Sequence, residues 1–411
     1  VTEQCRPLFR GEKADQLFPK HSAGVSYFCP TILIDSESIP SVTHTYTGTP
    51  TALSAPTRRV SFSDVTSGKA TASELAGQLT PEELALLCIG AARVSFTDFS
   101  VIGNASKSIP GAAGDTTDRL EGYGIPQCAM ADGPAGIRVN PKVYQRGDTY
   151  INNVEEDPIL GKVLPPELRK VDLSGTEIKY QYCTALPVAV QLAQSWNPKL
   201  AELAGDIAGA EMEELGIDLW LAPGLNIQRN PLCGRNFEYY SEDPYLSGIF
   251  AAAVTRGVQK HPGKGTCIKH LAANNQETCR STSNSHVSER ALREIYLRGF
   301  EICVKDSRPF SAMTSMNLLN GVHTANDQDL LTHALRDEWG FDGIVMTDWG
   351  TTGQFVSVGE ARKYGPSTPI GCILAGNDLI MPGTSFDEDT LFAAIRDGSL
   401  PVAALQDCGK R

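Results

Sequence analysis

Residues 197–222 read NPKLAELAGDIAGAEMEELGIDLWLA and join a helix pattern to a strand pattern. Asn197 and Pro198 are typical of a helix start, and Gly216 is typical of a helix end. Between them, apolar residues recur every three or four positions, so that one side of the helix is apolar. The run at 217–222 is short and apolar, as in a buried strand. The stretch therefore predicts a helix and the strand that follows it in a parallel sheet.

The same alternation of short apolar runs and amphipathic segments extends on both sides of this unit. It predicts further strands at 129–131, 265–268, 310–315, 343–346 and 379–381. It also predicts helices that begin near Thr80 and Ser288, and helices at 244–260, 326–339 and 386–397. Strands that alternate with helices form a parallel α/β sheet, which either stays open or closes into a barrel.

Two observations favour the closed form of the sheet. No G-x-G-x-x-G fingerprint follows a strand, and no G-x-x-x-x-G-K-[ST] motif occurs, so an open nucleotide-binding sheet has no support. Polar residues follow the ends of many different strands, as they do in barrel enzymes. We therefore predict that residues 76–411 form a (β/α)8-like TIM barrel that is irregular in its first units.

Residues 1–75 differ in character from the rest of the chain. Short strands are predicted at 25–28 and 31–34, and the stretch at 47–56 is rich in turn-forming residues. The segment is too short and too polar for a core of its own. We predict a short β-rich N-terminal segment that is either a linker or the tail of a preceding domain.

The composition excludes several classes of partner. Lys and Arg number 36 against 48 Asp and Glu, so the net charge is −12 and the chain repels phosphate backbones and anionic lipid. No apolar run approaches the roughly 20 residues of a membrane span. We therefore predict neither a nucleic-acid nor a membrane partner. The first residues show no basic or apolar region of a signal peptide, which favours the cytoplasm.

The cysteines and histidines indicate neither a disulfide scaffold nor a metal site. The 11 cysteines are scattered without a C-x-x-C pair, so we predict free and mostly buried thiols. His270, His323 and the aspartates lack the H-x-x-x-H or H-E-x-x-H spacing of a zinc site. We predict no metal and no cofactor.

Charged and aromatic residues gather at the carboxyl ends of the predicted strands. They include Asp132, Arg235, Lys269, His270, Arg280, Asp348 and Trp349. In a barrel such side chains meet at one rim, where charged groups can bind vicinal sugar hydroxyls and an aromatic ring can cover the apolar sugar face. Taken singly, Asp348 also fits a helix cap and Asp132 a turn. The pair Lys269–His270 also fits a buried core position.

Longer motifs around these residues point to one family. They are Asp132-Gly133, PLCGRNFEYYSEDP at 231–244, Lys269-His270 with NNQE at 274–277 and Arg280, VSERALRE at 287–294, and MTDWG at 346–350. Together they resemble glycoside hydrolase family 3, of the β-glucosidase type, over residues 75–411. The resemblance implies that Asp348 is the catalytic nucleophile and that Trp349 is an aromatic wall. It also implies that the sugar is held by Asp132, Arg235, Lys269, His270 and Arg280.

Two features depart from the usual pattern of this family. Met316, which we expect among the residues that bind the sugar, stands where the family usually has a tyrosine beside the nucleophile, and a thioether cannot donate the hydrogen bond of a hydroxyl. Most members also carry an α/β sandwich domain that supplies the general acid/base, and this chain stops at Arg411. The stretch at 61–69 is similar to permuted members, in which the sandwich comes first. The resemblance thus implies that a missing domain or a second polypeptide supplies the acid/base.

The function that the resemblance implies is that of an exo-acting, retaining β-glycosidase. Its partner would be a β-linked glucoside or oligosaccharide, cleaved through a covalent glycosyl-enzyme. The N-acetylglucosaminidase branch is not matched, because Leu271-Ala272-Ala273-Asn274 follows Lys269-His270 where that branch has Phe-Pro-Gly-His. Two other interpretations stay open: a sugar-binding barrel whose catalysis is impaired without its acid/base domain, and a β-glycoside phosphorylase.

Overall fold

A computed structural model of the chain describes residues 50–91, 106–147, 149–151, 153, 155, 165–353 and 364–411. Its centre is a curled six-stranded sheet with the order β1-β2-β6-β7-β9-β12. The strands are β1 (Gly114–Asp115), β2 (Ala129–Ala131), β6 (Leu219–Trp220), β7 (Gly265–Leu271), β9 (Ser311–Thr314) and β12 (Ile344–Met346). β1 runs antiparallel to β2, and the other neighbouring pairs are parallel. The chain therefore has an α/β fold whose sheet forms half of a barrel.

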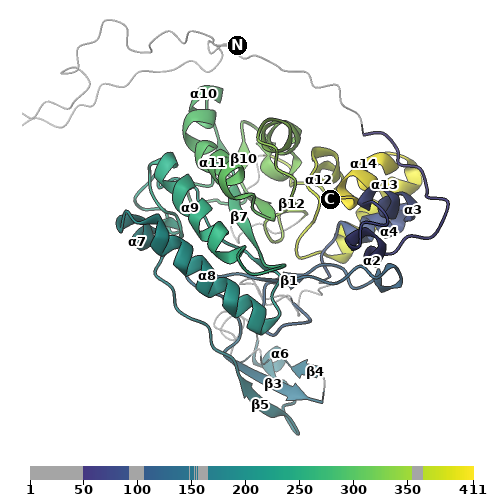
Figure 1. Cartoon of the computed structure of the whole chain (residues 1–411), viewed down its shortest axis with the longest axis horizontal. Helices are drawn as coiled ribbons and strands as arrows, with labels where there is room; N and C mark the ends of the chain where they lie inside the picture. The colour runs from purple at the N-terminus through teal and green to yellow at the C-terminus, as the bar shows by residue number, and fades with distance from the viewer. Residues whose placement is uncertain are drawn as a thin grey trace, which may run out of the picture. The chain divides into compact units, whose positions relative to one another are not determined.

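Helices connect the parallel strands in sequence order. They are α8 (Pro198–Leu215) before β6, α9 (Pro244–Val258) before β7, α11 (Arg298–Ser307) before β9, and the π-helix η7 (Asp329–Glu338) before β12. α9 packs against both α8 and α11, so the three helices lie side by side (Figure 1). This is the strand–helix alternation that the sequence predicts.

The α8–α9 pair shows how single residues position the layer of helices. Asn197 caps the start of α8 by accepting a bond from the Lys199 amide at 3.1 Å, and Gly216 ends the helix with a φ of 74°. A Cβ on Gly205 of α8 would meet the Val254 carbonyl oxygen of α9 at 2.1 Å. The two helices can approach this closely because Gly205 has no side chain.

Replacing Gly205 by alanine is expected to destabilise the fold by about 1–3 kcal/mol, because the added methyl group overpacks the α8–α9 contact. Urea unfolding would show the loss as a lower midpoint. Gly122→Ala is the matched control, since a Cβ there meets only the end of the Arg59 side chain at 3.8 Å. Equal midpoints for the two variants would contradict a tight α8–α9 contact.

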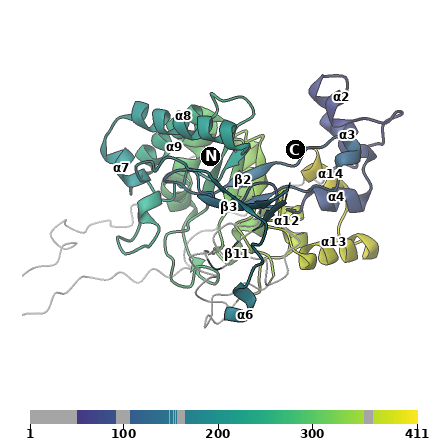
Figure 2. The same cartoon turned by 90° about the horizontal axis from the view of Figure 1, so that it is seen from below.

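A second group of helices packs around an apolar core of its own (Figure 2). They are α3 (Ala72–Gln78), α4 (Pro81–Leu87), α12 (Pro369–Ala375), α13 (Ser385–Asp397) and α14 (Val402–Gly409). Their core includes Leu84, Ile373, Leu391 and Leu405. Single bridges connect this group to the sheet, since Leu379 pairs with Met346 of β12. The next residue, Ile380, pairs with Ile89.

A small antiparallel sheet occupies part of the chain between β2 and α7 (Ala189–Gln194). Its strands, in the order β4-β3-β5, are β3 (Lys142–Arg146), β4 (Thr149–Ile151) and β5 (Glu177–Tyr180). Figure 1 shows it projecting beyond α8. The sequence pattern does not predict this sheet, because the strands are only three to five residues long and carry little periodicity.

Several predicted boundaries are confirmed and others differ. The helices predicted at 197–216, 244–260 and 386–397 are present within two residues of their predicted ends. The strand predicted at 217–222 is shorter, and the one at 379–381 is reduced to isolated bridges. The prolines that follow these two runs, Pro223 and Pro382, have no N–H to extend a ladder. The helix predicted from Ser288 is divided into α10 (Glu289–Ala291), the π-helix η5 (Leu292–Tyr296) and α11.

Of the predicted N-terminal segment, only residues 50–75 are described. They contain α2 (Phe62–Thr66) and the start of α3, whose capping residues are Ser61 and Thr71. The strands predicted at 25–28 and 31–34 lie outside the described residues. The domain boundary at residue 75 stays a prediction.

Two expectations from composition can be compared with the described ranges. The nine cysteines there are free thiols and six of them are buried, as the sequence predicts. Cys5 and Cys29 lie outside these ranges. No helix in the described part is both long enough and apolar enough to cross a membrane.

Candidate active site

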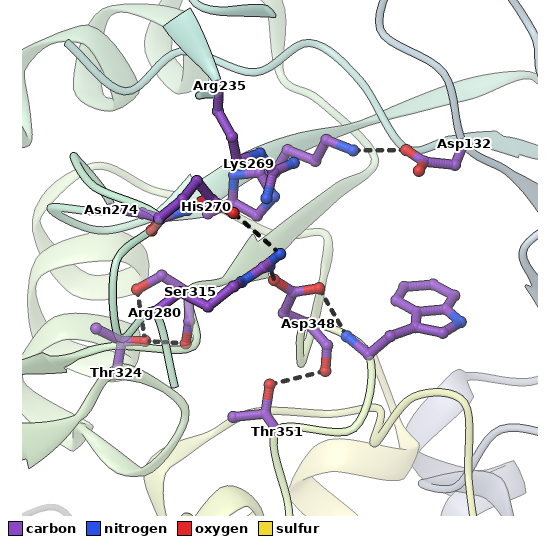
Figure 3. A network of polar contacts seen from close by, with 12 residues as sticks. Asp132, Arg235, Lys269, His270, Asn274, Arg280, Ser315, Thr324, Asp348 and Thr351 are labelled. Carbon is purple, nitrogen blue, oxygen red and sulfur yellow. Dashed lines mark hydrogen bonds and ion pairs between the residues drawn. The ribbon is translucent and has the colours of Figure 1, made fainter. Parts of the chain in front are cut away.

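A cavity of about 300 Å³ lies at the carboxyl ends of the parallel strands. Asp132 follows β2, and Lys269 and His270 lie near the end of β7. Asp348 follows β12 after one intervening residue. The cavity is lined by Ala113, Asp132, Arg138, Leu221, Arg235, Lys269, His270, Arg280, Met313, Asp348 and Trp349. Figure 3 shows the polar side chains converging from these different strands and loops.

A larger and more open hollow of about 810 Å³ lies at the opposite ends of the strands. Leu219, Phe310 and Ile344 line it, and these residues begin or precede β6, β9 and β12. Barrel enzymes keep their reacting groups at the carboxyl ends of the strands. The smaller cavity is therefore the candidate active site.

Asp348 is held in one orientation by its neighbours. Its Oδ1 accepts a hydrogen bond from the Trp349 amide at 2.7 Å, and its Oδ2 pairs with Nη2 of Arg280 at 3.2 Å. The backbone carbonyl oxygen of Asp348 accepts a hydrogen bond from the Thr351 hydroxyl at 2.8 Å (Figure 3). The side chain is 12% exposed, so the carboxylate is largely buried and still reaches the cavity.

Asp132 accepts bonds from two cations. Its Oδ1 accepts from Nζ of Lys269 at 2.6 Å, and its Oδ2 pairs with Nη2 of Arg138. Burial alone would raise the pKa of Asp132, but the charges of Lys269 and Arg138 outweigh it and hold that pKa below its usual range. Asp132 is therefore an ionised acceptor. Its charge also compensates Lys269, whose side chain is only 3% exposed.

Two more arginines reach the cavity, and a glutamate supports each of them. Arg235 pairs through Nε with the buried Glu238. Arg280 uses Nη1 to pair with Glu277 at 3.3 Å and Nη2 to pair with Asp348. Neither glutamate is among the residues that line the cavity. In this arrangement Glu238 and Glu277 orient guanidinium groups.

His270 presents a neutral ring to the cavity. Asn226 fixes its backbone by donating to its carbonyl and accepting from its amide, both at 2.8 Å. Nδ1 of the ring lies 3.3 Å from the Tyr239 hydroxyl. Burial lowers the pKa of His270 well below its usual range, and the charges of Arg235 and Lys269 lower it further.

One part of the cavity is apolar. The indole N–H of Trp349 donates to the Ala113 carbonyl at 2.9 Å, which fixes the ring at the cavity. Leu221 and Met313 complete the apolar lining. Aromatic and aliphatic groups of this kind can cover the C–H face of a sugar ring, while the charged groups bind its hydroxyls.

The structure brings together seven of the eight residues that the sequence singles out. They are Asp132, Arg235, Lys269, His270, Arg280, Asp348 and Trp349. Met316 is not among the lining residues; it follows β9 and is partly exposed, whereas Met313 of that strand reaches the cavity. Met316 lies beyond the last residue of β9, in the bend that follows the strand.

Arg138 is a cavity residue that the sequence analysis missed. It reaches Asp132 because the chain reverses tightly between them, with an isolated bridge that pairs the two residues. Gly133 and Gly136 have φ values of 110° and 122°, and a Cβ on Gly133 would meet the Gly136 carbonyl oxygen at 2.1 Å. The two closely spaced glycines were the available signal, since they permit a reversal that other residues resist.

The chemistry of the cavity suits a neutral ligand with several hydroxyl groups. Four cations and two carboxylates supply directional donors and acceptors around one apolar wall. Within the described ranges, no group of three or more His, Cys, Asp or Glu side chains is placed to hold a metal ion. A curled parallel sheet with such a cavity beyond its strand ends is the architecture of a barrel-type α/β enzyme.

Comparison with known families identifies the chain further. Residues 161–411 match the family model described as glycosyl hydrolase family 3 N terminal domain. The chain belongs to this family, which confirms the resemblance seen in its motifs. The match covers β6 to β12 and the helices between them.

Relatives of known name agree with this assignment. The chain is 41% identical over 286 residues to an exo-α-(1→6)-L-arabinopyranosidase of Bifidobacterium longum. The aligned residues cover 70% of this chain and 32% of the relative. The chain is 37% identical over 332 residues to β-glucosidase A of Butyrivibrio fibrisolvens. That alignment covers 81% of this chain and 32% of the relative. The chain therefore spans about a third of the length of these relatives.

Solved structures of β-glucosidases have the same fold. β-Glucosidase 3B from Thermotoga neapolitana, in complex with glucose, matches with a TM-score of 0.66 and 40% identity, over 83% of this chain and 42% of that one. A β-glucosidase from Paenibacillus barengoltzii matches with a TM-score of 0.68 and 37% identity, over 88% of this chain and 34% of that one.

Proposed function

We propose that this chain provides the nucleophile and the sugar subsite of an exo-acting, retaining β-glycosidase. The proposal is carried by the position of Asp348, whose carboxylate is held in one orientation at the cavity. The other carboxylate among the described lining residues, Asp132, is already paired with two cations. The β-glucosidases among the relatives support a β-linked glucoside or oligosaccharide as the substrate.

The proposed reaction has two steps. Asp348 attacks the anomeric carbon, the bond to the leaving oxygen breaks, and a general acid gives that oxygen a proton. Water, which loses a proton to the same acid/base residue, then attacks the anomeric carbon and releases Asp348. Two inversions at one carbon leave the sugar in its original β configuration.

The remaining cavity residues are proposed to hold the sugar during both steps. Asp132 accepts hydrogen bonds from sugar hydroxyls, and Lys269 and His270 donate to neighbouring ones. Arg235 and Arg280 add donors at the cavity, and Arg280 also holds Oδ2 of the nucleophile. Trp349 covers the apolar face of the ring, with its edge fixed by the bond to Ala113. Met316 has no proposed contact with the sugar.

The general acid/base is proposed to come from outside the cavity lining. A retaining enzyme needs a second carboxyl group about 5–5.5 Å from the nucleophile. Among the described lining residues the carboxylates are Asp132 and Asp348, and the lowered pKa of Asp132 keeps it ionised. We propose that a further domain or a second polypeptide, outside these 411 residues, supplies the acid/base. The same observation keeps a catalytically impaired sugar-binding barrel as the second candidate.

We also propose that the half-barrel sheet closes into an irregular (β/α)8 barrel. Single bridges lead from β12 through residues 379–380 to Ile89. The Ala91 amide then donates to the Asp115 carbonyl of β1 at 2.9 Å. These contacts support a barrel that is closed by isolated backbone pairs in the positions where a regular barrel has full strands.

The isolated chain is expected to release nitrophenol from aryl β-glucosides and to act poorly on alkyl glucosides and disaccharides. An alcohol leaving group needs a proton in the transition state, a contribution of roughly 10²–10⁴-fold, whereas nitrophenolate leaves without one. Added azide should speed turnover and yield the β-glycosyl azide, because azide attacks without a base. Nitrophenol release with and without azide measures the effect.

The control for this prediction is cellobiose under the same conditions. Brisk hydrolysis of cellobiose without an azide effect would place the acid/base inside this chain and contradict the proposal. Turnover that depends on phosphate would favour the phosphorylase. Sugar binding without any release of nitrophenol would favour the impaired barrel.

A further inference from the structure

Tyr239 lies directly behind the His270 ring. It is fully buried, at 0% exposure, and follows the short helix at Asn236–Glu238 that also carries the partner of Arg235. The rings of Tyr239 and His270 meet edge to face, with centroids 6.3 Å apart and planes at 74°. The Tyr239 hydroxyl is within hydrogen-bond distance of Nδ1 of His270, at 3.3 Å.

A second contact at the same hydroxyl fixes the direction of this hydrogen bond. Nδ2 of Asn274, a buried residue, donates to the Tyr239 oxygen at 3.3 Å. An amide nitrogen can only donate, so it cannot receive the tyrosine proton. Within the described part of the chain, Nδ1 of His270 is the acceptor left for that proton. A buried hydroxyl without an acceptor would be costly, so Tyr239 donates and Nδ1 accepts.

The protonation of the ring follows from this direction. His270 is neutral, since burial and nearby cations lower its pKa well below the usual range. A neutral imidazole carries one proton, and a ring whose Nδ1 accepts must carry that proton on Nε2. His270 lines the cavity, and no hydrogen bond to Nε2 is found among the described residues.

We propose that Tyr239, aligned by Asn274, is a positioning residue that sets the tautomer of His270 so that its Nε2–H donates to a hydroxyl of the bound sugar. This inference rests on the proposed function of the cavity. It adds the consequence of the tautomer: with the proton on Nε2, the ring donates to the oxygen of a sugar hydroxyl next to those that Asp132 binds. With the proton on Nδ1, a lone pair of Nε2 would face that oxygen.

The tautomer can be measured directly in the whole chain labelled with ¹⁵N-histidine. Long-range proton–nitrogen NMR distinguishes a protonated from an unprotonated ring nitrogen, and loss of one signal in His270→Gln assigns the resonance. The expected result is a protonated Nε2 and an Nδ1 that accepts a hydrogen bond. A proton on Nδ1 in the unmodified chain would overturn the proposal.

Two pairs of variants test the residues behind the ring. Tyr239→Phe should move the Nδ1 resonance to that of an unbonded nitrogen, whereas Tyr240→Phe, which removes a hydroxyl from the adjacent buried tyrosine, should not. Asn274→Asp should move the ring proton to Nδ1, because the new carboxylate accepts the hydrogen bond of the Tyr239 hydroxyl, whose oxygen then accepts one from Nδ1–H. Asn274→Ala adds no acceptor and should leave the proton on Nε2. An unchanged spectrum in both Tyr239→Phe and Asn274→Asp would overturn the role of Tyr239.

Sugar affinity links the tautomer to binding. With glucose as the probe, Asn274→Asp is expected to raise Kd about tenfold relative to Asn274→Ala, which corresponds to one lost neutral hydrogen bond. Equal affinities would overturn the proposed donation to the sugar. If the unmodified chain fails to bind glucose at all, the proposed function fails, and the NMR readout separates that failure from an incorrect tautomer.

Discussion

Asp348→Asn is expected to abolish formation of the glycosyl-enzyme and to lower kcat on aryl β-glucosides by roughly 10⁴-fold or more, as removal of a nucleophile does in other enzymes. A carboxamide cannot attack the anomeric carbon at a useful rate. The substitution keeps an oxygen that can accept from the Trp349 amide, and it loses the ion pair with Arg280. Steady-state nitrophenol release measures kcat, and thermal unfolding shows whether the fold is intact.

Asp397→Asn is the matched control, because Asp397 lies at the end of α13 and caps the amide of Ser399 outside the cavity. It should leave kcat unchanged. If Asp348→Asn kept a tenth or more of the rate with an intact fold, Asp348 would not be the nucleophile. A structural role in the turn that follows β12 would then be the better explanation.

Asp132→Ala is expected to lower kcat/KM roughly 10²- to 10⁴-fold, which corresponds to a loss of about 3–5 kcal/mol of transition-state binding. Two losses combine: the sugar loses a charged acceptor, and Lys269, at 3% exposure, loses the carboxylate 2.6 Å from its Nζ. Asp132→Asn keeps a neutral acceptor and should lose less. The measurement is kcat/KM on an aryl glucoside together with the urea midpoint of each variant.

The double variant Asp132→Ala with Lys269→Met separates these two losses. It removes the uncompensated charge, so the urea midpoint should recover while kcat/KM stays low. Recovery of both quantities would show that Asp132 only neutralises Lys269. Asp132 would then be a structural residue of the turn, as its place before Gly133 also allows.

The elements that the sequence predicted well are those with local signals. α8 combines a capping Asn197, a regular apolar face and a Gly216 terminator, so each local feature indicates the same helix. The small sheet with the order β4-β3-β5 has no such set of local features that all indicate the same element. The π-helical form of η5 and η7 depends on packing, which a 3.6-residue period does not report.

The candidate site was predictable to the extent that its residues follow strands. Asp132, Lys269 and Asp348 were found because the carboxyl ends of parallel strands meet at one edge. Arg138 enters the cavity through a glycine-dependent reversal, which residue type alone does not specify. Tyr239 could not be recognised, because its role depends on a contact with His270 across 31 positions of sequence.

The two glutamates behind the arginines show a signal that could have been used. Arg235 pairs with Glu238 and Arg280 pairs with Glu277, both at a separation of three residues. Such spacing brings side chains together in a single helical turn. Both glutamates are thereby committed to arginines, which argues against either of them as the acid/base.

Trapping of the covalent intermediate shows directly whether Asp348 is the nucleophile. The whole chain is incubated with a 2-deoxy-2-fluoro-β-glucoside that has a dinitrophenyl leaving group, digested, and analysed by mass spectrometry. The leaving group needs no acid, so the reaction does not depend on where the acid/base comes from. We expect one added fluoroglucosyl group on the peptide that contains Asp348, and none in Asp348→Asn. Absence of the added mass, or its presence on Glu238, Glu277 or any other residue, would show that Asp348 is not the nucleophile.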